Sequence, residues 1–216
     1  MQRADGQNSN ENQLQNFSYE LKQRNFREGY QTLTEDQIAG SPYLNRQFTE
    51  SVIVRTDHSV LKNISLRYNI FANRMEFKEK ETVLYIPDPY TISRIQIGNQ
   101  IFVYALYMTS KTVKASYFQL LTEGNYQLLK MYKVTFKNSD VKADIHDSPR
   151  FENQEPSYYF RYRDGMAHLI SSQKELIKIL QPVHEEVIDY IRSNKINARN
   201  QSQLIDLMNF TEKVMK

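Results

Sequence analysis

Three glycine-containing dipeptides constrain the fold most, because each lies between two runs of β-branched and aromatic residues. They are Gly98-Asn99, Gly124-Asn125 and Asp164-Gly165, and together they use half of the six glycines in the chain. Loops of this composition supply the positive backbone angles whose twist matches that of the two strands they join. The sequence therefore predicts an antiparallel β protein.

Short runs with strand composition fill the region after Phe48. In Ile64–Ile70 and Arg74–Lys78 every second residue is apolar, which predicts one buried and one solvated face. Ile101–Tyr107 is apolar on both faces, which is typical of a central strand that is covered on both sides. The expected strands are Ser51–Arg55, Val60–Asn63, Ile64–Phe71, Arg74–Lys78, Thr82–Ile86, Arg94–Ile97, Gln100–Met108, Ser116–Glu123, Tyr126–Lys137, Ser157–Arg163 and Met166–Ile170.

The connections predict how these strands are arranged. Asp57-His58 and Ala72-Asn73 are short, so consecutive strands should be neighbours. The Pro87-Asp88-Pro89 corner cannot donate ladder hydrogen bonds at either proline, and we expect the chain to pass there from one sheet to another. The predicted fold is mainly β (α+β): an antiparallel meander forming a β-sandwich or open barrel, with a short C-terminal helical unit.

The chain divides into three parts by composition. Residues 1–16 are dominated by Gln, Asn, Ser and acidic side chains, which predicts a flexible polar N-terminal lead. Residues 17–170 form the β-rich domain, and residues 171–216 change to a helical period. Ser172 followed by Glu175 is a capping box that opens the first helix. We expect this C-terminal helical unit to pack on the domain.

Composition and charge narrow the chemistry. The absence of cysteine excludes disulfides, thiolate zinc sites, iron–sulfur clusters and thiol catalysis, and no cofactor is predicted. The 28 basic and 25 acidic residues are spread along the chain and leave a net charge of +3, so no nucleic-acid partner is predicted. The longest apolar run, Ile101–Met108, is far shorter than the roughly 20 residues of a membrane-spanning helix. No transmembrane segment is predicted.

One polar stretch contains a possible set of metal ligands. Asp144, His146 and Asp147 offer two carboxylates and an imidazole that could converge on a divalent ion. The alternative is a solvated loop, in which such residues are ordinary, and this alternative is favoured. A metal-assisted hydrolase that uses the 144–147 loop is one functional hypothesis. Apart from this loop, no catalytic motif is recognised, and an enzymatic function is not favoured.

A second candidate site is the aromatic and basic run near the end of the β region. Tyr158, Tyr159, Arg161 and Arg163 could line a face that binds a ligand or partner. The favoured alternative is an ordinary edge or surface strand, because alternation places Tyr158 on one face and Tyr159, Arg161 and Arg163 on the other. No other stretch of the chain predicts a basic groove.

Several strand and turn segments resemble those of a set of uncharacterised exported proteins of Gram-negative bacteria. The segments are Gly40–Leu44, Leu66–Asn69, Met75–Phe77, Phe102–Tyr104 and Gly124–Lys130. The resemblance implies a β-rich fold and an envelope location, periplasmic or otherwise extracytoplasmic. An exported precursor would begin upstream of Met1 with a signal peptide that is removed.

These observations rank the functional hypotheses. We expect a non-catalytic binding or interaction protein of the bacterial envelope, with an envelope protein or a ligand as its partner. A carrier of a hydrophobic, lipid-like ligand is the first alternative, because strands that are apolar on both faces can enclose one. The hydrolase that uses Asp144, His146 and Asp147 is the second.

Overall fold

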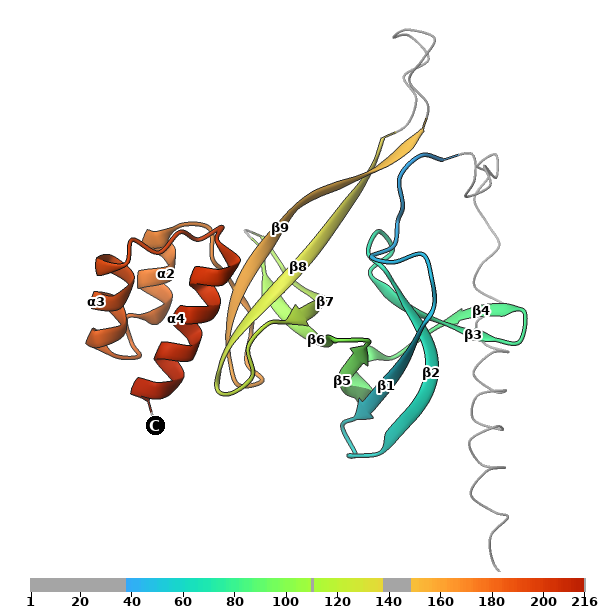
Figure 1. The fold of residues 1–216 in the computed structure, drawn as a ribbon, viewed down its shortest axis with the longest axis horizontal. Helices are drawn as coiled ribbons and strands as arrows, with labels where there is room; N and C mark the ends of the chain where they lie inside the picture. Colours follow the sequence, from blue (N-terminus) through green and yellow to red (C-terminus); the bar gives the residue numbers. More distant parts are fainter. Residues whose placement is uncertain (1–37, 110, 138–148, 216) are drawn as a thin grey trace, which may run out of the picture. The chain divides into compact units, whose positions relative to one another are not determined.

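The computed structural model describes residues 38–109, 111–137 and 149–215, and Ile38–Lys216 forms one compact unit (Figure 1). The described part of this unit is mainly antiparallel β, with three short α-helices after the last strand. The strands are β1 (Thr49–Arg55), β2 (Val60–Asn69), β3 (Arg74–Glu79), β4 (Thr82–Tyr85), β5 (Ile92–Ile97), β6 (Gln100–Met108), β7 (Val113–Leu120), β8 (Tyr126–Lys137), β9 (Arg150–Tyr162) and β10 (His168–Leu169). The β-rich prediction is therefore confirmed.

The strands form one ten-stranded sheet in the order β10-β9-β8-β7-β6-β5-β1-β2-β3-β4. Consecutive strands are neighbours everywhere except where β5 pairs with β1 instead of β4. The Pro87–Asp88–Pro89 corner and the 3-10 turn η2 (Pro89–Thr91) make this crossover, which returns the chain to the same sheet. The expectation that the chain changes sheets at this corner is wrong, because the second edge of β1 is open to pair with Ile92–Ile97.

Two of the three expected glycine turns use the left-handed backbone region. Gly98 has φ 55° between β5 and β6, and Gly124 has φ 108° in the connection from β7 to β8. In the third hairpin the positive φ belongs to Arg163, at 50°, and Gly165 does not adopt it. The dipeptides therefore mark the turns correctly. In the third turn the residue with positive φ is Arg163, two positions before Gly165.

The sheet curls, and β6 lies at the centre of the curl. Phe102 faces one core cluster together with Leu66, Met75 and Ile95, while Val103 faces another together with Phe118 and others. Both side chains are buried, which confirms the expected central strand that is covered on both faces. The Ala167 N–H donates to the Leu106 carbonyl at 2.8 Å, so the chain entering β10 reaches back to β6. A sandwich of two sheets is not confirmed.

The helices α2 (Gln173–Leu180), α3 (Glu185–Ser193) and α4 (Gln201–Val214) stand together beside β8 and β9 (Figure 1). The Ser172 hydroxyl accepts a hydrogen bond from the Glu175 N–H, as the capping box predicts. Apolar side chains of the three helices share a buried cluster with Leu128 and Phe160 of the sheet. Among the described residues, no helix combines the length and the apolar character needed to cross a membrane.

Candidate functional site

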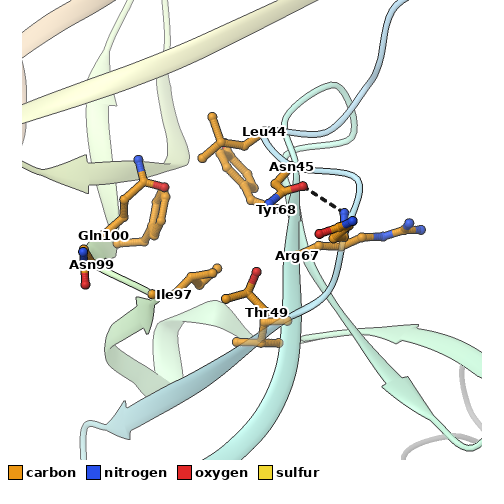
Figure 2. Close-up of a pocket in the computed structure, with 12 residues that line it drawn as sticks. Leu44, Asn45, Thr49, Arg67, Tyr68, Ile97, Asn99 and Gln100 are labelled. Carbon is orange, nitrogen blue, oxygen red and sulfur yellow. Dashed lines mark hydrogen bonds between the residues drawn. The ribbon is translucent and has the colours of Figure 1, made fainter.

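A cleft of about 230 Å³ lies where three distant segments of the chain meet. They are the segment that leads into β1 and its first residue, the C-terminal end of β2, and the hairpin that joins β5 to β6 (Figure 2). The lining consists of Leu44, Asn45, Gln47, Thr49, Leu66, Arg67, Tyr68, Ile97, Gly98, Asn99, Gln100 and Phe102. The cleft is smaller than the roughly 300–1,000 Å³ of most small-molecule sites, and its size suits a single side chain or a fragment.

The floor of the cleft is apolar. Leu66 and Tyr68 are two residues apart on β2, so strand alternation points both toward the core, and Phe102 of β6 lies in the same cluster. The rings of Tyr68 and Phe102 have centroids 5.7 Å apart. Burial raises the pKa of Tyr68, and its hydroxyl therefore stays neutral and donates to Asn73 Oδ1 at 3.3 Å. Leu66 and Phe102 are fully buried, so the uncharged apolar surface that a ligand can reach comes from Leu44 and Ile97, which are partly exposed.

Amide and hydroxyl side chains form the rim. Asn99 and Gln100 stand on one side of the cleft, and Asn45 and Thr49 stand on the other (Figure 2). Asn45 Oδ1 accepts the Gln47 N–H at 3.0 Å, drawn as the dashed line in Figure 2. The Asn45 carboxamide is therefore held by its oxygen.

Two consecutive hydrogen bonds through the Tyr132 hydroxyl hold the Gln100 side chain. Gln100 Nε2 donates to the Tyr132 hydroxyl at 3.3 Å, and that hydroxyl donates to Gln119 Oε1 at 2.6 Å. Burial raises the pKa of Tyr132, so the phenol keeps the proton that it donates. Gln100 is thus oriented by groups outside the cleft, and Asn45 by the backbone N–H of the lining residue Gln47.

Arg67 contributes to the lining, but its guanidinium points away from the cleft (Figure 2). Arg67 Nε donates to Glu76 Oε2 at 2.9 Å, and Arg67 Nη2 donates to the Tyr43 hydroxyl at 2.7 Å. The guanidinium also lies 3.8 Å from the centroid of the Tyr43 ring. This cation is engaged on the opposite face of β2.

Glu76 is the centre of a buried polar cluster behind β2. Its carboxylate side chain is 2% exposed and also accepts hydrogen bonds from Asn69 Nδ2 and Arg74 Nε, each at 2.9 Å. A buried carboxylate with this many donors is typical of a structural ion pair, which removal of one partner would destabilise strongly. The chemistry available in the cleft is therefore hydrogen bonding and apolar contact.

The proposed metal ligands Asp144, His146 and Asp147 lie outside the described residues, so that prediction remains open. Within residues 38–109, 111–137 and 149–215, no group of three His, Asp or Glu side chains gathers in a way that could hold a metal ion.

The structure places Tyr158, Tyr159, Arg161 and Arg163 on β9 and at its end. Tyr158 is buried beneath the helices and its hydroxyl donates to Gln201 Oε1 at 3.3 Å, while Tyr159 lies inside the curl with its ring 5.1 Å from that of Phe118. Burial raises the pKa of Tyr159 to about 12.

Arg161 is also buried, and its Nε donates to Gln127 Oε1 at 2.8 Å. Arg163 is exposed and its Nε donates to Asn125 Oδ1 at 3.2 Å. The expected alternation of Tyr158 and Tyr159 is present, but β9 is covered on both faces here and is not a surface strand. A binding role for these four residues remains a prediction.

The sequence does not single out the rim residues of the cleft. Asn99 is half of a turn dipeptide, and Asn45, Thr49 and Gln100 belong to segments that come together through the crossover of β5 onto β1. Amide side chains are common in turns, so their composition alone carries no signal for a site.

Comparisons with protein-family models, curated proteins and solved structures gave no match.

Proposed function

We propose that the protein is a non-catalytic binding or interaction protein and that the cleft between β1, β2 and the β5–β6 hairpin is its recognition site. The observation that carries the proposal is an oriented rim of amide and hydroxyl groups above an apolar floor. A few placed polar groups over apolar surface are the usual design of a binding pocket, because the apolar part supplies affinity and the polar part supplies specificity.

The location that we propose is the bacterial envelope. The support is the resemblance of segments such as Leu66–Asn69 and Gly124–Lys130 to exported proteins, together with a chain of 216 residues that contains no cysteine. Many exported bacterial proteins lack free thiols, whereas cytosolic proteins usually keep a few. The polar composition of residues 1–16 fits a spacer between a removed signal peptide and the folded part.

The carrier hypothesis has one observation in its favour, the apolar lining of the cleft, in which Leu44 and Ile97 are partly exposed. The interior of the curl holds buried side chains such as Phe118 and Leu129, so a lipid-like ligand would have to use the cleft. At about 230 Å³ the cleft takes a short apolar group better than an acyl chain. The hydrolase hypothesis rests on the 144–147 loop, and metal analysis of the purified protein tests it.

A screen of small neutral fragments tests the proposed site. Saturation-transfer NMR would be recorded with the wild-type protein, with Thr49→Phe, which fills the cleft, and with Thr82→Phe as the control. Thr82 is an exposed residue at the start of the edge strand β4. We expect fragments that bind the wild-type protein and Thr82→Phe but not Thr49→Phe. Fragments that bind all three proteins equally, or no binding at all, would contradict the proposal.

A further inference from the structure

The orientation of the Gln100 carboxamide follows from the single proton that the Tyr132 hydroxyl can donate. The Tyr132 hydroxyl has one proton and gives it to Gln119 Oε1 at 2.6 Å. Toward Gln100 the phenol oxygen can therefore only accept, and Gln100 must present Nε2 to it, at 3.3 Å. The Gln100 Oε1 atom is left as the acceptor for a ligand.

On the other side of the rim, the Asn45 carboxamide offers donors instead of an acceptor. Asn45 Oδ1 is occupied by the Gln47 N–H, which leaves the two N–H donors of the Asn45 carboxamide for a ligand. Thr49 adds a hydroxyl on the same side as Asn45 (Figure 2). A ligand that satisfies this rim needs a donor facing Gln100 and an acceptor facing Asn45.

The cleft also favours a neutral ligand. The only guanidinium among the lining residues, that of Arg67, is paired with Glu76 on the opposite face of β2. A charged ligand would lose hydration in the cleft without gaining an opposite charge, and this loss is costly. Between the two sides of the rim, the partly exposed side chains of Leu44 and Ile97 offer apolar surface above the buried Leu66, Tyr68 and Phe102.

We infer that the ligand is an uncharged peptide segment, with a backbone N–H toward Gln100, a backbone carbonyl toward Asn45 and one apolar side chain on the floor. This inference rests on the proposed function and names the ligand class for the same cleft. A lipid chain lacks the donor. A sugar brings donors, acceptors and an apolar C–H face, but no aliphatic side chain for the apolar lining. In this arrangement Tyr132 is a positioning residue that acts through Gln100.

The probe for this inference is N-acetyl-leucine methylamide, titrated into the protein with its affinity read from amide chemical shifts. Its doubly N-methylated analogue keeps both carbonyls and loses both N–H donors. We expect the wild-type protein to prefer the methylamide by about fivefold, the worth of one net hydrogen bond. N-acetyl-glutamate methylamide and N-acetyl-lysine methylamide should bind more weakly than the leucine probe.

Two variants test the orientation of Gln100. Tyr132→Phe removes the hydroxyl that holds Gln100, and Gln100→Met removes the acceptor while leaving the Tyr132–Gln119 bond in place. Both should reduce the preference for the methylamide to less than twofold, whereas the control Tyr162→Phe, on β9, should keep it. An unchanged preference in Gln100→Met would overturn the inferred role of Gln100.

Two further ligands separate this inference from the proposed function. If octanoate or methyl glucoside shifts Gly98, Asn99 and Gln100 and the leucine probe does not, the peptide inference is wrong and the cleft is still a binding site. If none of these ligands shifts the cleft residues, both proposals fail. Saturable binding of the leucine probe at these residues, with the expected preference for N–H donors, supports both.

Discussion

The carboxylate of Glu212 lies directly against Gly124, so that a Cβ atom on Gly124 would stand 2.8 Å from Glu212 Oε2. Glu212 belongs to the last helix, α4, and Gly124 to the connection between β7 and β8. The same oxygen accepts the backbone N–H of Asn125 at 3.0 Å and that of Tyr126 at 3.2 Å. The Glu212 side chain of α4 therefore holds the connection between β7 and β8 in place through two hydrogen bonds.

Substitution of Gly124 by alanine should cost about 1–3 kcal/mol of unfolding free energy, because φ 108° is a conformation that other residues rarely adopt. Gly98→Ala is the matched comparison and should cost less, about 1 kcal/mol. Its φ of 55° lies in the ordinary left-handed region, and the new Cβ would meet only Thr49 Cγ2 at 3.9 Å. Denaturant titration measures both, and a larger loss at Gly98 would contradict this reasoning.

Glu212→Ala should destabilise the protein by about 1–2 kcal/mol, because two backbone donors lose a charged acceptor. Glu212→Gln keeps an oxygen in place and should cost less. In the Glu212→Ala background, Gly124→Ala should be less harmful than in the wild-type protein, since the close contact is gone. Strict additivity of the two substitutions would show that the contact does not couple them.

Asn73 closes a gap in the sheet and should be intolerant of change. It lies in the turn between β2 and β3 with φ 49°, and its Oδ1 accepts the Tyr117 N–H at 3.2 Å and the Ser116 hydroxyl at 2.9 Å. Its Nδ2 donates to the Ala115 carbonyl at 3.3 Å. Because β7 pairs with β8 only at Gln119 and Leu120, this carboxamide occupies the place of a neighbouring strand.

Two variants separate the roles of Asn73. Asn73→Gly loses the carboxamide but tolerates the backbone angle, and should cost about 1–3 kcal/mol because a buried donor is left unpaired. Asn73→Ala should lower the free energy of unfolding by about 1 kcal/mol more than Asn73→Gly, since the left-handed conformation is also unfavourable for alanine. Thermal or denaturant unfolding compares them, and equal stability of the two variants would argue against strain at this position.

Stability should fall in strong alkali. Burial raises the pKa of Tyr159 from 10.0 to about 12, so above pH 10 the unfolded chain loses this proton while the folded protein retains it. The stability contributed by the neutral phenol is therefore complete below pH 10 and is lost as the pH rises to about 12. The midpoint of urea unfolding measured between pH 9 and 12 should decrease less steeply in Tyr159→Phe; an identical slope would contradict burial as the cause.

Local signals in the sequence predict much of the fold. Tyr126–Lys137 and Gln100–Met108 are strands with the expected bounds, and Ser172 caps α2 as expected. These elements depend on turn chemistry, alternation and capping, which involve residues close together in the chain. The burial of Phe102 and Val103 on opposite faces follows from the same pattern.

The crossover and the cleft could not be predicted in this way. The pairing of β5 with β1 joins segments that are far apart in the chain, and the Pro87–Asp88–Pro89 corner marks a turn without indicating which strand edge the chain will pair with next. The cleft depends on that pairing, because it brings Thr49 beside Gly98 and Gln100. Gln100 further depends on Tyr132 of β8, a contact across the curled sheet.

The most direct test of the central claim is a chemical-shift map of the isotope-labelled protein with a bound neutral fragment from the proposed screen. We predict saturable shifts at Thr49, Gly98, Asn99 and Gln100, which line the cleft, and their loss in Thr49→Phe but not in Thr82→Phe. Shifts that map to another surface and persist in Thr49→Phe would contradict the assignment of the cleft as the recognition site.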